Sequence, residues 1–246
     1  MLDRDTTPEL PPGLALAWGA TPPPRRGPKP AHTVAQIVAA AVELADADGV
    51  ANASLPNIAH EVGVTTNALY RYVSSKEELT VLLADAGWGP PPAGLASSGD
   101  WRSDVRAWTR AVVERLLGRT WLLDLSMRGD PVTPHRLAWT EVLLRACSLA
   151  GVGEEHLLGC VTLVSGFAHA TAVRLATPTT PAEASAVRDH LAPRLSRADS
   201  AGLAALVSAG RYPATAEDRE TFFTTGLDPV LAAVAGLTGR EWETVF

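Results

Sequence analysis

The sequence predicts an all-α protein of about ten helices, and three observations lead to this prediction. Apolar residues recur every three or four positions over most of the chain, and no alternating run is convincing as a strand. The hydrophobic fraction of 46% includes only four Phe and three Tyr, so Ala, Leu and Val supply most of it, which favours helices. A Gly-, Pro- and Ser-rich connector at 87–99 separates two helical parts. The length of 246 residues suits one large or two smaller domains.

The first 31 residues are expected to form an irregular, proline-rich basic arm. They hold eight of the 19 prolines and show helical character only in the brief stretch LALAW. Arg25, Arg26 and Lys29 cluster near the end of this arm, in the proline-stiffened sequence PPPRRGPKP. The chain starts with acidic MLDRD rather than with a basic and then apolar segment, so we expect no signal peptide.

A first helix is predicted from Thr33 to Asp48. Thr33 and Gln36 have the spacing of a capping box at its start, and Gly49 is the expected stop. Apolar residues form a wide stripe along it, at Val34, Ile37, Val38, Ala41, Val42, Leu44 and Ala45. This helix therefore has a face to bury.

The stretch from Leu55 to Tyr72, LPNIAHEVGVTTNALYRY, predicts two short helices joined by a sharp turn. Ile58 and Leu69 give each helix an apolar contact, and Ala59 is small enough for another helix to cross closely. Gly63 stands at the turn, where a residue that tolerates positive φ is favoured. This is the pattern of a helix-turn-helix, although pairs of short helices that merely pack on each other share it.

The side chains left outside that core point to DNA. We expect Thr65, Thr66 and Asn67 to reach base edges, Ser54, Tyr70 and Lys76 to contact phosphates, and Arg71 to do either. A second capping box, Ser75 with Glu78, opens a connecting helix that runs to about Ala86. The sequence therefore predicts a three-helix DNA-binding domain over 32–86.

The overall charge is unusual for a protein that binds DNA. The formal net charge is -6, and residues 22–84 carry five Lys or Arg against six Asp or Glu. Phosphate neutralisation supplies most non-specific affinity for DNA, so the positive charge must be local. The arm with Arg25, Arg26 and Lys29 is either a DNA-contacting segment or a solvated linker.

These segments resemble a known family. The order AVELADADG, SLPNIAHEVGV and ALYRYVSSKEEL is similar to the amino-terminal domain of the tetracycline-repressor (TetR) family of bacterial regulators. The downstream segments DWRSDVRAWTRAVVERLLGRTWLLDL, TPHRLAWTEVLLRACSLAGV and FTTGLDPVLAAVAGL resemble the helical ligand domain of an actinobacterial branch. The resemblance covers roughly residues 25–238, and its first third is the most specific. Val73 stands where many relatives carry Phe.

The second part, over 100–240, is predicted as a helical bundle for ligand binding and dimerisation. Trp101, Val105, Trp108, Val112 and Leu116 recur at helical spacing. Further helices are expected at 122–127, from an N-cap and N1 pair at 133–134 to about 150, at 154–175, within 181–210 with an interruption at Pro193, and at 217–237.

The helices at 154–175 and 217–237 are the expected dimer contacts. Each has more apolar surface than a single core needs, and the resemblance places a dimeric four-helix bundle there. The alternative is that both are plain core helices. Residues 157–173 contain no Asp, Glu, Lys or Arg, but their Gly, Thr, Ser and His argue against a membrane span.

A ligand site is expected among aromatic side chains with a few polar groups. The candidates are Trp101, Trp108, Trp121, Met127, His135, Trp139, Phe167, His169 and Arg174. Each of them is also compatible with plain core packing. The resemblance implies small, often aromatic or lipophilic effectors that alter the separation of two DNA-reading heads.

No metal, cofactor or catalytic motif is recognisable. The histidines are scattered, Cys147 and Cys160 lack ligand spacing, and no P-loop, GxSxG or dinucleotide fingerprint occurs. We therefore expect no enzyme, no metal and no cofactor, and a reduced cytoplasmic compartment. The predicted function is a dimeric, ligand-responsive DNA-binding regulator, most simply a repressor. The alternative is a helical small-molecule- or partner-binding protein whose DNA head no longer functions.

Overall fold

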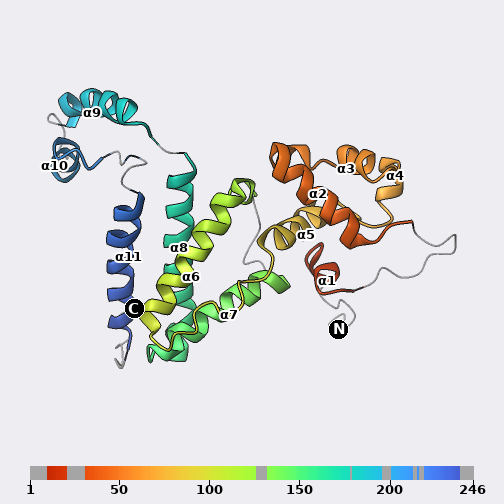
Figure 1. The fold of residues 1–246 in the computed structure, drawn as a ribbon, viewed down its shortest axis with the longest axis horizontal. Helices are drawn as coiled ribbons and strands as arrows, with labels where there is room; N and C mark the ends of the chain where they lie inside the picture. Colours follow the sequence, from red (N-terminus) through yellow and green to blue (C-terminus); the bar gives the residue numbers. More distant parts are fainter. Residues whose placement is uncertain are drawn as a thin grey trace, which may run out of the picture. The chain divides into compact units, whose positions relative to one another are not determined.

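A computed structural model describes residues 10–20, 31–125, 132–177, 179–195, 201–212, 215 and 219–238. Over these residues the protein contains eleven α-helices and two 3-10 turns, with isolated bridges as its only β pairing (Figure 1). The all-α prediction is confirmed. The chain divides into two compact units, Met1–Gly99 with Gly118–Ala146, and Asp100–Leu117 with Cys147–Phe246. The predicted ranges 1–31, 32–86 and 100–240 divide the chain by expected function rather than by compactness. They differ from these two units and remain a prediction.

The first unit is built on α2 (Val34–Asp48), which begins and ends where its sequence predicts. Thr33 and Gln36 form the complete capping box, and the Gly49 N–H donates to the Ala45 carbonyl. Ile37, Ala41 and Ala45 are buried, and α2 packs against both α3 (Leu55–Glu61) and α5 (Lys76–Trp88). The helix therefore forms the back of the helix-turn-helix.

The second predicted capping box is only half formed. The Ser75 Oγ accepts the Glu78 N–H at 3.1 Å as expected. However, the Glu78 carboxylate accepts from the N–H and the hydroxyl of Ser74, not from the Ser75 N–H. The helix α5 also continues two residues beyond the predicted end and stops before Gly89.

A short helix, α1 (Leu14–Ala17), packs on α5. It corresponds to the LALAW stretch of the predicted arm. The Trp18 Nε1 donates to the Val132 carbonyl at 2.9 Å, so residues 10–20 are bound to the rest of the first unit.

The remainder of the first unit departs from the prediction in two places. The helix expected around 122–127 is replaced by a 3-10 turn, Thr120–Leu122, and residues 126–131 lie outside the described part. The next helix, α7 (Pro134–Leu149), lacks its predicted side-chain cap, because the buried Thr133 Oγ1 has no hydrogen-bond partner among described residues. Instead, the Asp85 carboxylate accepts the His135 N–H at 2.9 Å.

The second unit comprises α6 (Trp101–Gly118), α8 (Glu154–Ala176), α9 (Pro181–Leu195), α10 (Ala201–Ser208) and α11 (Arg219–Gly236). The helices α8 and α11 lie side by side, and α9 packs on α10 (Figure 1). Two ion pairs join α6 to α11, Arg106 with Asp228 and Arg110 with Glu220. The predicted interruption at Pro193 is wrong, because α9 continues through Pro193 to Leu195.

Candidate nucleic-acid interface

The helix-turn-helix is formed by α3, a turn at 62–65 and α4 (Thr66–Leu69). Gly63 has a φ of 70°, which is the left-handed region that its position was expected to require. Ile58, Ala59 and Leu69 are buried at 2% exposure or less, so the two helices share one small core. The predicted supersecondary motif is therefore present.

The predicted base-reading residues lie at the start of α4. Thr65 is its N-cap, and the Thr65 Oγ1 accepts the Ala68 N–H at 3.2 Å. Thr65 and Asn67 are exposed and Thr66 is half-buried. The Asn67 side chain makes no hydrogen bond to any residue in the described part of the chain. It is thus available to a ligand outside this protomer.

The predicted phosphate-contacting residues flank that set. Tyr70, Arg71 and Lys76 are exposed, and Tyr70 shows 46% of its surface although it is aromatic. Ser54 is half-buried and caps α3, where its Oγ accepts the Asn57 N–H at 3.4 Å. A hydroxyl that accepts in a cap retains its own proton for donation to a phosphate.

Two polar contacts in this region were missed from the sequence. The Tyr72 hydroxyl accepts the His32 N–H at 3.3 Å and ties the entry of α2 to the end of the motif. The Asn57 amide donates to the carbonyl and the side chain of Asn52. Local sequence carries no signal for the first contact, because its two partners lie 40 residues apart.

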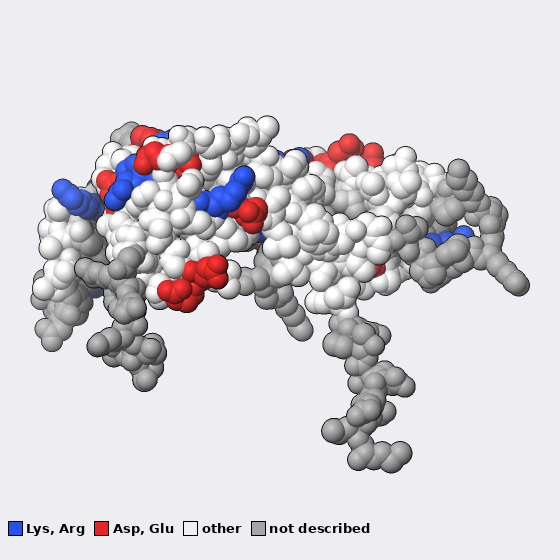
Figure 2. All heavy atoms as spheres, turned by 90° about the horizontal axis from the view of Figure 1, so that it is seen from below, with Lys and Arg blue, Asp and Glu red and all other residues white. Residues whose placement is uncertain are grey.

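The local charge of the motif is slightly positive. Between Ser54 and Lys76 the chain has Arg71 and Lys76 against Glu61. The arm residues Arg25, Arg26 and Lys29 lie outside the described residues. Figure 2 shows one face of the molecule, on which described acidic and basic side chains form small separate groups rather than a continuous basic band.

Three of the ligand candidates belong to the first unit, where internal contacts occupy their polar groups. The Trp139 indole is buried and donates to the Gly89 carbonyl at 2.9 Å. The His135 Nδ1 lies 2.9 Å from the Asp85 carbonyl oxygen and 3.1 Å from its carboxylate. The Trp121 indole donates to Asp46.

Five other candidates belong to the second unit. Trp108 is buried, Trp101 and Phe167 are half-buried, and His169 and Arg174 are exposed on α8. Met127 lies outside the described residues. The nine candidates thus divide between the two units, and the ligand site stays a prediction. No group of three or more His, Cys, Asp or Glu able to hold a metal occurs among the described residues.

A helix-turn-helix with an exposed polar and aromatic second helix, joined to a helical second unit, defines the class of helix-turn-helix DNA-binding proteins. The profile of bacterial regulatory proteins of the tetR family matches residues 37–82, and that of the tetracyclin repressor-like C-terminal domain matches 93–237. The chain belongs to this family. It is a transcriptional regulator, and the prediction that it is no enzyme is confirmed by its family.

Named relatives agree with this membership. The chain is 31% identical over 216 residues to an HTH-type transcriptional regulator of Saccharopolyspora erythraea, covering 87% of this chain and 89% of that protein. It is 33% identical over 156 residues to the HTH-type transcriptional repressor DrrR1 of Streptomyces coeruleorubidus. That match covers 63% of this chain and 57% of the length of DrrR1.

Solved structures show the same fold. Apo ActR from Streptomyces coelicolor superposes with a TM-score of 0.70 at 22% identity, covering 86% of this chain and 99% of ActR. ActR in complex with actinorhodin gives a TM-score of 0.67 at 22% identity, with 87% and 100% covered.

Proposed function

We propose that the protein is a dimeric repressor that binds an operator through α3 and α4 and releases it when a small apolar or aromatic effector binds. The observation that carries this proposal is the division of the motif into a buried side, with Ile58 and Leu69, and an exposed side, with Asn67 and Tyr70. A buried side alone is enough for packing. The exposed side supplies the donors and acceptors that base edges require.

Roles within the interface follow from position. Thr65, Thr66 and Asn67 open the recognition helix and are assigned to base edges. Ser54, Tyr70 and Lys76 are assigned to phosphates, and Arg71 to either. A single motif reads only a few base pairs, so two copies are needed, with recognition helices about one helical turn of DNA apart.

The dimer is assigned to α8 and α11. One face of α8, opposite its buried stripe, carries exposed Gly159, Leu163, Gly166, Ala170 and Val173 at spacings of three and four. Small residues between larger apolar ones let another helix approach closely. The exposed positions of α11, which packs on α8, include Thr225, Pro229 and Ala232. This uncharged surface fits a second copy of the same chain.

Among the described residues, α8 alone is long and apolar enough to cross a membrane, and 28% of its most apolar 18-residue window is buried. Length and composition cannot separate a spanning helix from an interface helix. We favour the interface, because α8 packs on α11 and its exposed face is mixed with Gly, Thr and His. The two free cysteines fit the cytoplasm, where the regulator and its DNA would meet.

The effector class is supported by two considerations. ActR, which shares the fold, has been solved in complexes with (S)-DNPA and with actinorhodin. This chain contributes Trp101, Trp108 and Phe167 to its second unit, so an aromatic ligand has suitable partners there. His169 and Arg174 are candidate polar contacts.

Binding to the upstream region of its own gene tests the proposal. Fluorescence anisotropy at low salt is expected to show saturable binding that weakens steeply as salt increases, since phosphate contacts release counterions. No binding at low salt, together with tight binding of an aromatic compound, would favour the alternative of a helical ligand-binding protein with an inactive DNA head.

A further inference from the structure

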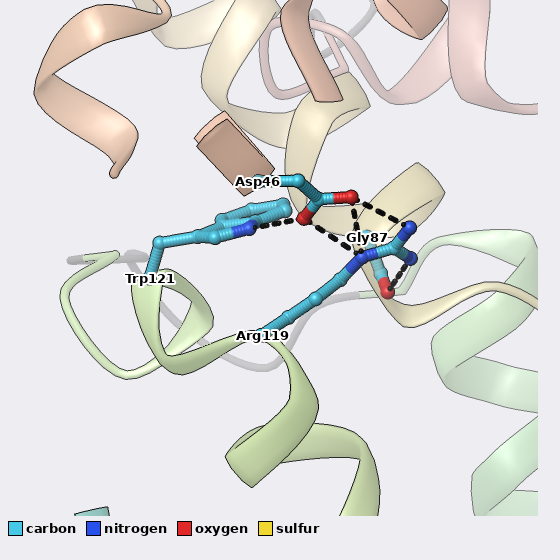
Figure 3. A network of polar contacts seen from close by, with 4 residues as sticks. All are labelled: Asp46, Gly87, Arg119 and Trp121. Carbon is cyan, nitrogen blue, oxygen red and sulfur yellow. Dashed lines mark hydrogen bonds and ion pairs between the residues drawn. The ribbon is translucent and has the colours of Figure 1, made fainter. Parts of the chain in front are cut away.

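A four-residue network joins the back of the DNA-binding helices to the turn that follows α6 (Figure 3). The Arg119 guanidinium places Nε and Nη2 on the Asp46 carboxylate, at 3.0 Å to Oδ1 and 3.0 Å to Oδ2. Its Nη1 donates to the Gly87 carbonyl at 2.9 Å. The Trp121 Nε1 donates to the same Asp46 carboxylate at 2.7 Å. We call Asp46, Gly87, Arg119 and Trp121 the clasp.

The clasp is closely packed as well as polar. A Cβ added at Gly87 would lie 2.3 Å from the Trp121 Cη2 and 2.9 Å from the Leu122 Cδ2. Trp121 and Leu122 are buried. The 3-10 turn thus lies directly against α5 at a position where any side chain would push it away, and the indole is held in one place with its N–H directed at α2.

The clasp is less exposed than the Arg106–Asp228 ion pair of the second unit and has more hydrogen bonds. The Asp46 and Arg119 side chains are 36% and 27% exposed, against 57% and 44% for Asp228 and Arg106 in the second unit. A forked guanidinium on a carboxylate is the favoured geometry for this pair, and a third donor adds a charge-assisted bond. Removal of one partner leaves the others with unmet hydrogen bonds.

We infer that the clasp positions the helix-turn-helix for DNA binding. It ties the end of α2 to the end of α5, and α2 in turn packs on α3, which packs on α4. Asp46 is acidic, which makes it a poor contact for DNA, so it acts through the helices that it holds. Asp46, Arg119 and Trp121 are therefore positioning residues. This inference rests on the proposed operator binding.

Electrostatics and positioning predict opposite results for one substitution. Asp46→Asn removes a negative charge from an acidic protein, and charge alone predicts tighter DNA binding. If the clasp positions the motif, the same variant binds more weakly. Asp228→Asn makes the same charge change at an exposed pair in the second unit and serves as the matched control.

The experiment measures affinity for a duplex that the unmodified full-length protein has selected from a random pool. We expect Asp46→Asn and Arg119→Gln each to weaken binding by about threefold to tenfold per folded molecule, and the double variant to lose no more than either one. Arg119→Lys should restore part of the affinity. Trp121→Phe should lose less than Asp46→Asn, because it keeps the packing.

The salt dependence separates positioning from contact. Because no phosphate contact is lost, the slope of log affinity against log salt should stay unchanged, whereas a lost phosphate contact would lower it by about 1. Tighter binding by Asp46→Asn, additive losses, or a lower unfolding temperature with unchanged affinity would overturn the inference. Failure of the unmodified protein to select any duplex would remove the operator-binding proposal as well.

Discussion

The polar side chains of the helix-turn-helix differ in whether a hydrogen bond within the protein already occupies them. Thr65 already accepts a hydrogen bond that caps α4, whereas Asn67 is exposed and makes no hydrogen bond within the described residues. An amide that can donate and accept together suits an adenine edge. Of the residues proposed to reach base edges, Asn67 is therefore the better candidate for sequence discrimination, whereas Thr65 also caps α4.

The Asn67→Ala variant is expected to relax the preference at one base position. A good base contact contributes about 1 to 3 kcal/mol of discrimination, so the loss should be visible in a repeated binding-site selection. An unchanged preferred sequence for this variant would show that the assignment of Asn67 is wrong.

The Tyr70→Ala variant should weaken binding to every DNA sequence by a similar factor. The exposed phenol is assigned to a phosphate, which carries no sequence information. Anisotropy titrations with selected and scrambled duplexes would measure the two affinities. A change in their ratio, with the scrambled affinity unaffected, would refute the phosphate role.

The two cysteines predict a particular alkaline sensitivity. Burial, and to a smaller extent the neighbouring Cys160, raise the pKa of Cys147 to about 12. The unfolded thiol ionises near its ordinary value of 9.0, so stability is complete below pH 9 and falls as pH rises toward 12. At pH 10 ionisation of this thiol in the unfolded chain should lower the free energy of unfolding by on the order of 1 kcal/mol.

Urea unfolding at pH 8 and pH 10 would measure this effect. The free energy of unfolding should fall less over this interval for Cys147→Ala than for the unmodified protein. Equal falls would mean that the Cys147 thiol does not contribute.

At the scale of whole elements, helix bounds followed closely from local sequence wherever the cap was local. Thr33 with Gln36 and the stop at Gly49 gave α2 without error. The start of α7 at Pro134 also followed from local sequence, but its cap did not: the Asp85 carboxylate, 50 residues before His135, accepts the His135 N–H in place of the predicted Thr133 cap. Likewise, the 3-10 turn at Thr120–Leu122 is shaped by contacts with Asp46 and Gly87 that no local pattern reveals.

The exposed face of α8 yields a prediction about assembly. Leu163→Glu places a charge in the proposed interface and should convert the dimer to a monomer at micromolar concentration. Leu137→Glu on α7 is the matched control, because the two leucines are 40% and 38% exposed. Size-exclusion chromatography with light scattering reports the mass.

Three outcomes would contradict the assignment of the dimer to α8. These are a monomeric unmodified protein, a Leu163→Glu variant that stays dimeric, and an unmodified protein recovered only with lipid or detergent. The last of these would point to a membrane role for α8.

For the molecule as a whole, the net charge is -6, so the basic side chains that contact DNA must be concentrated at one place on the surface. The sequence located the motif and its exposed side chains, because the apolar spacing that predicts burial and the side-chain caps of α2, α3 and α4 are local in the sequence. It could not assign the ligand candidates, since Trp121 and Trp139 are equally good core residues, and the structure shows their N–H groups bound internally.

The arm makes a testable contribution to this charge balance. Deletion of residues 1–30 is expected to weaken operator binding and to flatten its salt dependence. Because α1 packs on α5, the deletion also removes a structural contact. Replacement of Arg25, Arg26 and Lys29 by Ala, in the full chain, separates charge from packing. Unchanged affinity and slope in that variant would show that the arm is a linker.

Binding-site selection from a random pool of duplexes, with the full-length protein, tests the central claim most directly. A dimer that reads DNA through two copies of α4 should enrich an inverted repeat whose half-sites are centred about 10 base pairs, one helical turn, apart, or a multiple of this. Enrichment of no sequence at low salt would contradict operator recognition by this motif, and enrichment of a single half-site without symmetry would contradict the dimer.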